Sequence, residues 1–324
     1  MSPKRPKVGV TRRLPATVES ALREKYEVVQ AAEDHALTLD ELASLLRSCE
    51  VVVPTVTDRI DARLLSAKDV KAKLLANFGV GTNHIDLDAA KSAGIAVTNT
   101  PDVLTEDTAD LAITLMLAVM RRVGEGERLV RSGKWDGWTP TQMLGRRLSG
   151  KALGVVGLGR IGRAVATRAE NGFGMKVLAW SRSKRRGSEA GTRIERVNRI
   201  DELMERSDVV SVHCPLVPTT RHLIGAPQFA KMRRTGVLIN TARGPVVDEA
   251  ALVAALEAGK LAGAGLDVYE EEPTVHPGLL SREDVVLLPH LGSATVETRE
   301  AMGMRALANI DAHIAGRDLP DRVS

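Results

Sequence analysis

The sequence predicts an α/β protein built from two doubly wound parallel-sheet domains. Short apolar segments alternate with helical ones along most of the 324 residues, which is typical of parallel strands covered by helices on both faces. The length favours two domains, and a hydrophobic content of 44% is enough to fill two cores. A glycine-rich turn near residue 157 opens a second series of strands, which separates one domain from the other.

The first series of elements covers residues 7–98. Apolar runs predict strands at residues 7–11, 26–29, 50–53, 73–76 and 95–98. Helical periodicity predicts helices at residues 16–25, 39–47 and 87–93, and Gly94 follows the last of them, as a glycine often does at a helix end. We expect this part of the first domain to end at residue 100, before Pro101.

An apolar helix is predicted at residues 105–122. Its first turn carries acidic residues and its last turn arginines, an arrangement that the helix dipole favours. Because this helix is apolar on nearly every side, we expect it to be buried between the domains. The next residues, 124–148, are polar and irregular, and they include Trp135 and Trp138.

The second series of elements begins at residue 151. Strands are predicted at residues 152–156, 176–180, 209–213, 236–240, 263–268 and 285–288, with helices at 160–170, 200–205 and 248–258. One long helix, residues 294–315, cannot fit inside a finished doubly wound sheet. We therefore expect residues 1–100 and 293–324 to form one domain, with residues 101–292 inserted as the second.

The stretch from residue 151 to residue 170 carries the first functional signal. An apolar strand ends at Val156, and Gly157, Gly159 and Gly162 then have the spacing G-x-G-x-x-G before a helix. The first glycine permits a tight turn, the second lets a pyrophosphate approach the backbone, and the third lets the helix pack on the strand. The helix N-terminus directs free N–H groups at the phosphates. The stretch therefore predicts a dinucleotide site rather than an ordinary glycine-rich turn.

Composition limits the other functions and the location. Cys49 and Cys214 give neither a disulfide framework nor metal-ligand spacing, so we expect no metal site and a reducing cytoplasm. No signal peptide is recognisable, and the longest apolar run, residues 111–120, has about half the length that spans a membrane. The net charge is only +4, and charged residues of both signs are scattered along the chain. This pattern argues against nucleic acid as a partner.

The end of the second strand of the dinucleotide domain indicates which cofactor binds. NAD sites usually carry an acidic residue about twenty positions after the glycines, whereas Ser181, Arg182 and Ser183 follow the strand here, with basic residues up to Arg186. Hydroxyl groups and a guanidinium suit the 2′-phosphate of NADP, which a carboxylate would repel. The sequence thus predicts a preference for NADPH, with NAD as the alternative coenzyme at the same site. The alternative is a solvated basic loop.

Three further segments each follow a predicted strand, where ligands of parallel sheets bind. They are residues 240–244, 267–273 and 289–292. With residues 78–86 (F-G-V-G-T-N-H-I-D) and 213–216 (H-C-P-L), they make the chain resemble the D-isomer-specific 2-hydroxyacid dehydrogenases from about Val8 to Ala308. The sequences S-R-S, E-E-E-P and W-D-G-W-T-P resemble most the glyoxylate/hydroxypyruvate reductases of that family. The resemblance implies a Rossmann domain inserted into a flavodoxin-like substrate domain.

The resemblance also implies three catalytic residues. Arg243 would bind the substrate carboxylate and polarise the 2-oxo group. His290 would supply the proton during reduction. Glu272 would favour the protonated imidazole; charge alone would allow Glu270 or Glu271 equally, and only the motif selects Glu272. Taken singly, such an arginine is commonly a salt-bridge partner, such acids a solvated loop, and such a histidine a structural one.

Further binding contacts follow from the resemblance. The backbone N–H groups of Val80 and Gly81 would hold the substrate carboxylate, unless they form an ordinary turn. Asp267 would accept from the nicotinamide amide or only cap its strand. Trp138 would reach the active site of a partner subunit or only anchor its own loop. The remaining implied cofactor contacts are Thr108, Leu158, Arg160, Ile161, Cys214, Pro215, Thr220, Thr241, Ala242 and Gly292.

The expected function is the NADPH-preferring reduction of small 2-oxo acids, glyoxylate to glycolate or hydroxypyruvate to D-glycerate, by a homodimer. One alternative is another dehydrogenase of the family, such as a 2-ketogluconate reductase or a phosphoglycerate dehydrogenase. The latter is disfavoured because the chain ends soon after Gly316, without a regulatory domain. The other alternative is a dinucleotide-sensing, corepressor-like binding protein. Such proteins usually bind NAD, and Ser181 and Arg182 argue against that cofactor.

Overall fold

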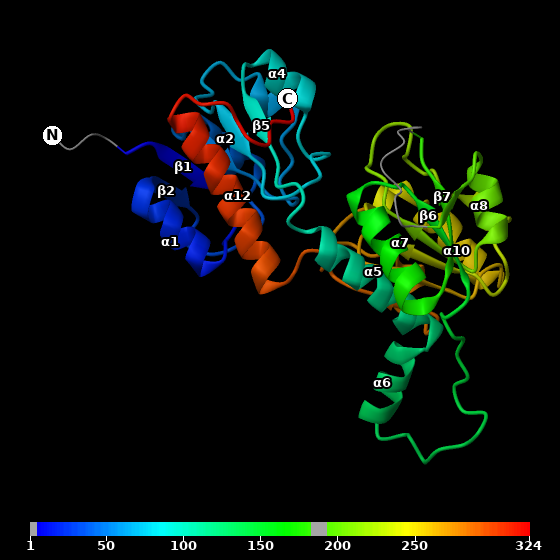
Figure 1. Ribbon diagram of the computed structural model, residues 1–324. Helices are drawn as coiled ribbons and strands as arrows, with labels where there is room; N and C mark the ends of the chain where they lie inside the picture. Colours follow the sequence, from blue (N-terminus) through cyan, green and yellow to red (C-terminus); the bar gives the residue numbers. More distant parts are fainter. Residues whose placement is uncertain (1–4, 183–192) are drawn as a thin grey trace. The chain divides into compact units, whose positions relative to one another are not determined.

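The computed structural model describes residues 5–182 and 193–324, and these form two compact units. Unit 1 comprises the described residues through Leu104 together with Ala294–Ser324, and unit 2 comprises those of Thr105–Ser293. Within each unit a parallel sheet is flanked by helices (Figure 1). No helix in the described stretches is long and apolar enough to cross a membrane.

Unit 1 contains a five-stranded parallel sheet in the order β2-β1-β3-β4-β5, the order of flavodoxin-like sheets. Its strands are β1 (Lys7–Val10), β2 (Glu27–Gln30), β3 (Val51–Val53), β4 (Leu74–Ala76) and β5 (Ala96–Thr98). Its helices are α1 (Ala16–Lys25), α2 (Leu39–Ser48), α3 (Ala62–Leu65), α4 (Leu87–Ser92) and α12 (Val296–Ile314). Helix α12 packs on α1 and β4, so the last helix of the chain completes the unit in which the chain begins (Figure 1).

Unit 2 contains a seven-stranded parallel sheet in the order β12-β11-β10-β9-β6-β7-β8. Its strands are β6 (Ala152–Val156), β7 (Lys176–Trp180), β8 (Ile194–Arg196), β9 (Val209–Val212), β10 (Val237–Asn240), β11 (Gly263–Leu266) and β12 (Val285–Leu287). Its helices are α5 (Thr105–Met120), α6 (Val123–Arg131), α7 (Arg160–Phe173), α8 (Ile200–Arg206), α9 (Ala226–Phe229), α10 (Glu249–Glu257), α11 (Pro277–Leu280) and the 3-10 turn η1 (Gly244–Val246). The strand order reverses between β6 and β9, and ligands of such sheets bind where it does.

The apolar helix α5 packs on the sheet of its own unit. It contacts α7 and strands β10, β11 and β12, and Leu115 and Met116 are fully buried. A Cβ on Gly265 in β11 would lie 3.1 Å from Leu115 Cβ, so the glycine lets the helix approach the strand closely. These contacts, all within unit 2, account for the burial of α5, so contact with a second domain is not needed to explain its apolar surface.

Helix α6 corrects the expectation that residues 124–148 are irregular throughout. Gly124 and Gly126 weaken the helical signal of the sequence. The helix is supported by an ion pair of 2.6 Å between Arg122 and Glu125 and by a second pair between Glu127 and Arg131. Together with the residues that follow, α6 extends away from the sheet of unit 2 (Figure 1).

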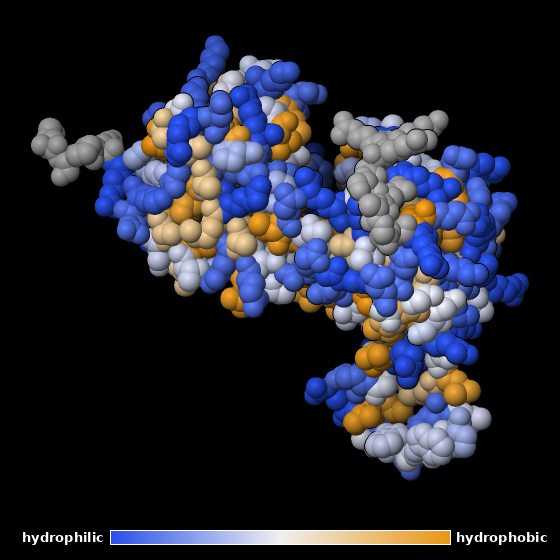
Figure 2. Space-filling view, in the orientation of Figure 1, coloured by the Kyte–Doolittle hydropathy of each residue, from blue (hydrophilic) through white to orange (hydrophobic). Residues whose placement is uncertain are grey.

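The extension leaves apolar side chains exposed. Figure 2 shows orange, apolar surface on this part of unit 2. The exposed fractions are 53% for Val123, 58% for Val130, 78% for Trp138 and 69% for Leu144. Exposed apolar side chains that gather in this way mark an interaction surface more often than a solvated one.

Candidate functional site

The glycine turn joins β6 to α7 where the strand order of unit 2 reverses. Gly157 has a φ of +100°, and a Cβ there would lie 2.6 Å from the backbone nitrogen of Cys214, just after β9. A Cβ on Gly162 would lie 2.1 Å from the carbonyl oxygen of Gly157. On Gly159, by contrast, a Cβ would meet no atom of the described residues within 4 Å. Packing therefore requires two of the glycines, whereas Gly159 borders open space at the N-terminus of α7.

Hydroxyl and guanidinium groups gather after β7. Ser181 Oγ accepts from Arg196 Nη1 at 3.5 Å, and Arg182 donates to Thr219 Oγ1. Arg182 and Arg196 are exposed. Ser183 and residues 184–186 lie outside the described residues. The described part of this segment has the chemistry that binds a phosphate.

Thr241 carries a buried hydroxyl that lacks a hydrogen-bond partner among the described residues. Its Oγ1 atom makes no hydrogen bond to any described residue, although buried hydroxyls are normally hydrogen-bonded. A cofactor bound at this position would supply the hydrogen-bond partner that Thr241 Oγ1 lacks. Thr108 and Thr220 differ, because their hydroxyls donate to Gly292 O at 2.8 Å and to Pro215 O at 2.7 Å and so brace loops.

The residues after β9 bring no charge to the turn at neutral pH. Burial lowers the pKa of His213 to about 3 and raises the pKa of the Cys214 thiol to about 11. Among the other predicted contacts, Leu158 is buried, Ile161 and Ala242 are half-buried, and Arg160 and Pro215 are exposed.

His290 and Glu272 contact each other after β12 and β11. His290 Nδ1 lies 2.8 Å from Glu272 Oε2, while Glu272 Oε1 accepts from the backbone N–H of Tyr269 at 3.1 Å. Burial alone would raise the pKa of Glu272, but the hydrogen bond and charge of His290, the Tyr269 N–H group and Arg243 together lower it. Since Nδ1 is occupied, Nε2 is the ring nitrogen that can exchange a proton with a ligand.

The backbone of His290 is held in an unusual conformation. Its φ is +56°, a region that residues with a Cβ seldom adopt. The His290 N–H group donates to Asp267 O at 3.0 Å. The next two N–H groups, of Leu291 and Gly292, donate to the Asp267 carboxylate at 2.6 and 2.8 Å. Strain of this kind persists where surrounding contacts fix it, and Asp267 is fully buried.

Asp267 therefore acts as a cap for the loop that carries His290. Burial raises its pKa even though its two oxygens accept from Leu291 and Gly292. For Asp267, the sequence left a capping role open as the alternative to a contact with the nicotinamide amide. Such a contact would have to share one of the two carboxylate oxygens that accept from Leu291 and Gly292.

Arg243 follows β10 and completes the group. Its Nη1 atom donates to Ala242 O at 2.7 Å. Burial lowers its pKa and the Glu272 carboxylate opposes this effect; a guanidinium stays protonated in either case. Arg243, Glu272 and His290 thus lie on loops after three adjacent strands of unit 2, as an arginine, a carboxylate and a histidine suited to bind and protonate a small acid.

Val80 and Gly81 lie in unit 1, in the loop after β4. Asn77 Nδ2 donates to Gly79 O at 2.9 Å and to Gly81 O at 3.1 Å, and Asn99 Nδ2 donates to Val80 O at 2.9 Å. Three successive carbonyls are therefore engaged. No described residue accepts from the N–H groups of Val80 and Gly81. Successive free N–H groups of this kind bind anions.

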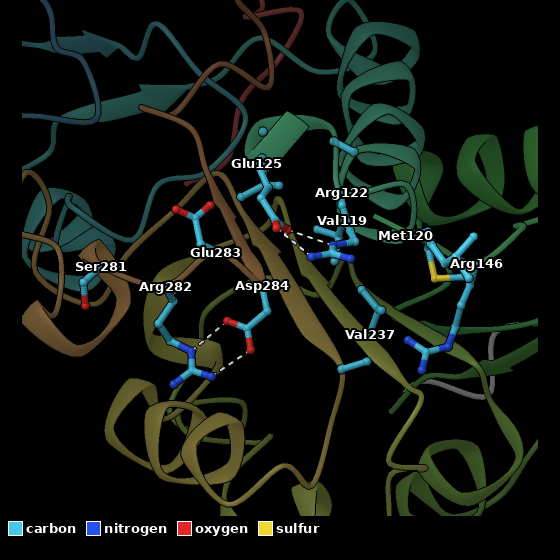
Figure 3. A pocket seen from close by; sticks show the side chains of 16 residues that line it. Val119, Met120, Arg122, Glu125, Arg146, Val237, Ser281, Arg282, Glu283 and Asp284 are labelled. Atoms are coloured by element: carbon cyan, nitrogen blue, oxygen red, sulfur yellow. Dashed lines mark hydrogen bonds and ion pairs between the residues drawn. The ribbon is translucent and has the colours of Figure 1, made fainter. Parts of the chain in front are cut away.

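A cavity of about 650 Å³ lies elsewhere in unit 2 (Figure 3). Its lining includes Val237, the first residue of β10, and residues 281–284, which precede β12, so it lies at the opposite strand ends from Arg243 and His290. Four of its charged side chains form two ion pairs, Arg122 with Glu125 at 2.6 Å and Arg282 with Asp284 at 2.7 Å. We do not assign it a catalytic role.

Three residues that shape the site were not predicted from the sequence: Asn77, Asn99 and Tyr269. Asn77 and Asn99 directly follow β4 and β5. Their position at the carboxyl ends of strands is the signal that could have found them. Tyr269 lies three residues after β11 and had no polar motif of its own.

The comparisons with known proteins agree with this geometry. Residues 113–292 match the family model "D-isomer specific 2-hydroxyacid dehydrogenase, NAD binding domain". The chain is 43% identical to a glyoxylate reductase of Thermococcus litoralis, over 99% of this chain and 97% of that one. A glyoxylate reductase structure from Paecilomyes thermophila has 36% identity and a TM-score of 0.86, with 98% of each chain covered.

A second solved structure is equally similar. It is the NADPH-dependent glyoxylate/hydroxypyruvate reductase SmGhrB from Sinorhizobium meliloti, in complex with NADP and malonate. It has 36% identity and a TM-score of 0.86, with 99% of this chain and 97% of that chain covered. The chain belongs to the D-isomer-specific 2-hydroxyacid dehydrogenase family and is an NAD(P)-dependent oxidoreductase of 2-oxo acids.

Proposed function

We propose that this enzyme reduces glyoxylate and hydroxypyruvate and prefers NADPH. The observation that carries the proposal is the contact of 2.8 Å between His290 Nδ1 and Glu272 Oε2, in the same unit as Arg243 and the glycine turn. The similar proteins named above as glyoxylate reductases support a small 2-oxo acid as substrate.

Each residue of the group has a distinct task in this proposal. When bound at Gly159, the nicotinamide cofactor supplies the hydride. Arg243 binds the substrate carboxylate and stabilises the charge that develops on the 2-oxo group. His290 donates a proton from Nε2 to that oxygen, and Glu272 orients the ring and favours its protonated form. In unit 1, the free N–H groups of Val80 and Gly81 offer a binding site for a carboxylate.

The cofactor preference rests on the residues after β7. Ser181 and Arg182 offer a hydroxyl and a guanidinium to a 2′-phosphate, and Arg196 lies beside Ser181. The similar SmGhrB protein is described as NADPH-dependent and was solved with NADP. NADH would lose the phosphate contact and bind more weakly.

A matrix of substrates and cofactors tests the proposal. Purified enzyme would be assayed with NADPH and NADH against glyoxylate, hydroxypyruvate and 2-ketogluconate. Turnover of the first two with NADPH supports the proposal. A preference for the longer sugar acid would identify another dehydrogenase of the family. Negligible turnover of all three acids would instead favour a dinucleotide-sensing binding protein.

We further propose that the enzyme is a cytoplasmic homodimer. The exposed side chains of Val123, Val130, Trp138 and Leu144 offer an apolar surface to a second copy, and Trp138 would then reach the partner's active site. Sedimentation velocity measures the oligomeric state directly. The Val130→Glu substitution should shift the equilibrium from dimer toward monomer. A wild-type chain that sediments as a monomer would contradict the proposal.

A further inference from the structure

Tyr269 joins the two loops that carry His290 and Glu272. Its backbone N–H group donates to Glu272 Oε1 at 3.1 Å, and its hydroxyl donates to Leu288 O at 2.8 Å. Leu288 is two residues from His290 in the chain. One residue therefore fixes the carboxylate at one end and the backbone leading to the imidazole at the other.

The third loop of the site packs on the same residue. A Cβ on Gly244, the neighbour of Arg243, would lie 1.8 Å from the carbonyl carbon of Tyr269. The two backbones therefore touch, and no side chain can separate them. The next peptide is held as well, because the Glu270 N–H group donates to Glu249 Oε1 at 2.6 Å.

The Tyr269 hydroxyl is well suited to a fixed role. The side chain is only 7% exposed and packs in the apolar core beside the sheet of unit 2. Burial raises the pKa of Tyr269, so the hydroxyl stays a donor throughout the working pH range. The half-buried Leu288 carbonyl would lose this donor in a variant without the hydroxyl.

We propose that Tyr269 is a positioning residue of the reductase, whose hydroxyl sets the distance between the His290 imidazole and the Glu272 carboxylate. The inference rests on the proposed function, in which that pair delivers a proton to the substrate. Without the hydroxyl, the loop leading to His290 shifts relative to Glu272. The imidazolium then loses part of its stabilisation, although neither catalytic side chain has been changed.

Tyr269→Phe tests the proposal because it removes one oxygen atom and keeps the ring in the core. We expect kcat for glyoxylate to fall by about 10-fold with KM within about twofold, since Arg243 still binds the carboxylate. The alkaline limb of the kcat/KM profile should move to lower pH, in the same direction as in a Glu272→Gln variant that lacks the carboxylate charge. A residue that only stabilised the fold would lower Tm and leave this limb in place.

A matched control is Tyr26→Phe, in the only other tyrosine of the chain. The Tyr26 hydroxyl donates to Asp311 Oδ1 at 2.6 Å in unit 1, so its loss also removes a structural hydrogen bond. We expect this variant to lose stability and to keep the wild-type pH profile. If both variants have the wild-type profile and kcat, the proposal for Tyr269 is wrong.

A second readout separates this inference from the proposed function. The ring signals of His290, assigned by comparison with His290→Asn, can be titrated by NMR without any substrate. We expect the titration midpoint to lie at lower pH in Tyr269→Phe than in wild type. An unchanged midpoint overturns the proposal even if the enzyme reduces glyoxylate. A shifted midpoint supports it even if glyoxylate is not a substrate.

Discussion

Glu272 Oε2 lies 2.8 Å from His290 Nδ1, although the two residues belong to loops after different strands. The side chains are 30% and 28% exposed, so water reaches the pair and screens part of its charge. The hydrogen bond still fixes the ring by one nitrogen. This arrangement orients the other nitrogen and couples the protonation of the two groups.

Glu272→Gln should move the pH dependence of the reaction. The pKa of Glu272 is lowered in the folded protein, so the group is ionised at neutral pH and favours protonated His290. Glutamine keeps the shape and removes the charge. Because reduction consumes the proton on His290, the alkaline limb of kcat/KM moves to lower pH, and the rate at pH 8 falls by about 10-fold.

The neighbouring Glu271 provides the control for that variant. Glu271 is exposed and carries the same charge one residue away. Glu271→Gln should therefore keep the wild-type profile. A Glu272→Gln profile that cannot be distinguished from the Glu271→Gln profile would mean that Glu272 and His290 are not coupled.

Arg243→Ala should separate substrate binding from cofactor binding. We expect KM for glyoxylate to rise by about 100-fold and kcat to fall, because the carboxylate loses a bidentate partner and the 2-oxo group its cation. Fluorescence titration should give an unchanged Kd for NADPH. Arg243→Lys restores the charge without the fork and should recover only part of the loss. Unchanged KM and kcat in Arg243→Ala would remove this residue from the site.

The sequence predicted most of the fold because the signals are local. Alternating strands and helices, and the glycines at 157, 159 and 162, depend on periodicity and on steric rules that act within a few residues. Helix α6 was not predicted, because Gly124 and Gly126 lower the helix propensity of its sequence. The ion pairs that support it form only once the helix exists.

The site was less predictable, because its contacts join distant parts of the chain. Three consecutive acids have different surroundings: Glu270 pairs with His222, Glu271 is exposed, and Glu272 pairs with His290. Their charges are identical, so only the family motif selected the last one. Tyr269 binds a backbone carbonyl 19 residues away, and no sequence pattern marks an acceptor that every residue possesses.

Gly159→Ala and Gly162→Ala should change different properties, the first the affinity for NADPH and the second the stability of the fold. A Cβ at position 159 meets no described atom within 4 Å, so this variant should fold with the wild-type Tm. It should raise the Kd for NADPH by about 10-fold or more, because the methyl group occupies the approach of the pyrophosphate. At position 162 the Cβ would lie 2.1 Å from Gly157 O, so Tm itself should fall. Wild-type NADPH affinity in folded Gly159→Ala would exclude the turn as the pyrophosphate site.

Arg182→Ala should reduce the preference for NADPH. The guanidinium contributes affinity only when the cofactor carries a 2′-phosphate, so the Kd for NADPH should rise by about 10-fold while that for NADH stays within about twofold. Arg234→Ala is a suitable control, because Arg234 is exposed and precedes β10, at the other end of the sheet. Equal weakening of both cofactors by Arg182→Ala would rule out the phosphate contact.

Asn77→Ala should weaken substrate binding from within unit 1. Asn77 is fully buried, and its amide holds the carbonyls of Gly79 and Gly81 while its oxygen lies 2.9 Å from His84 Nε2. Without it, the Gly81 carbonyl loses its hydrogen-bond donor and can turn toward the anion that the N–H groups of Val80 and Gly81 are proposed to bind.

We therefore expect KM for glyoxylate to rise by about 10-fold in Asn77→Ala, with an unchanged Kd for NADPH. Asn309→Ala is the matched control, since Asn309 is an equally buried asparagine of unit 1 whose amide donates to Arg305 O and to Asp321. Both variants should lose stability, because each removes the hydrogen bonds of a buried amide side chain, but only Asn77→Ala should change KM. If KM rises equally in both, the change reflects general loosening of unit 1, and the loop after β4 has no specific role in binding the acid.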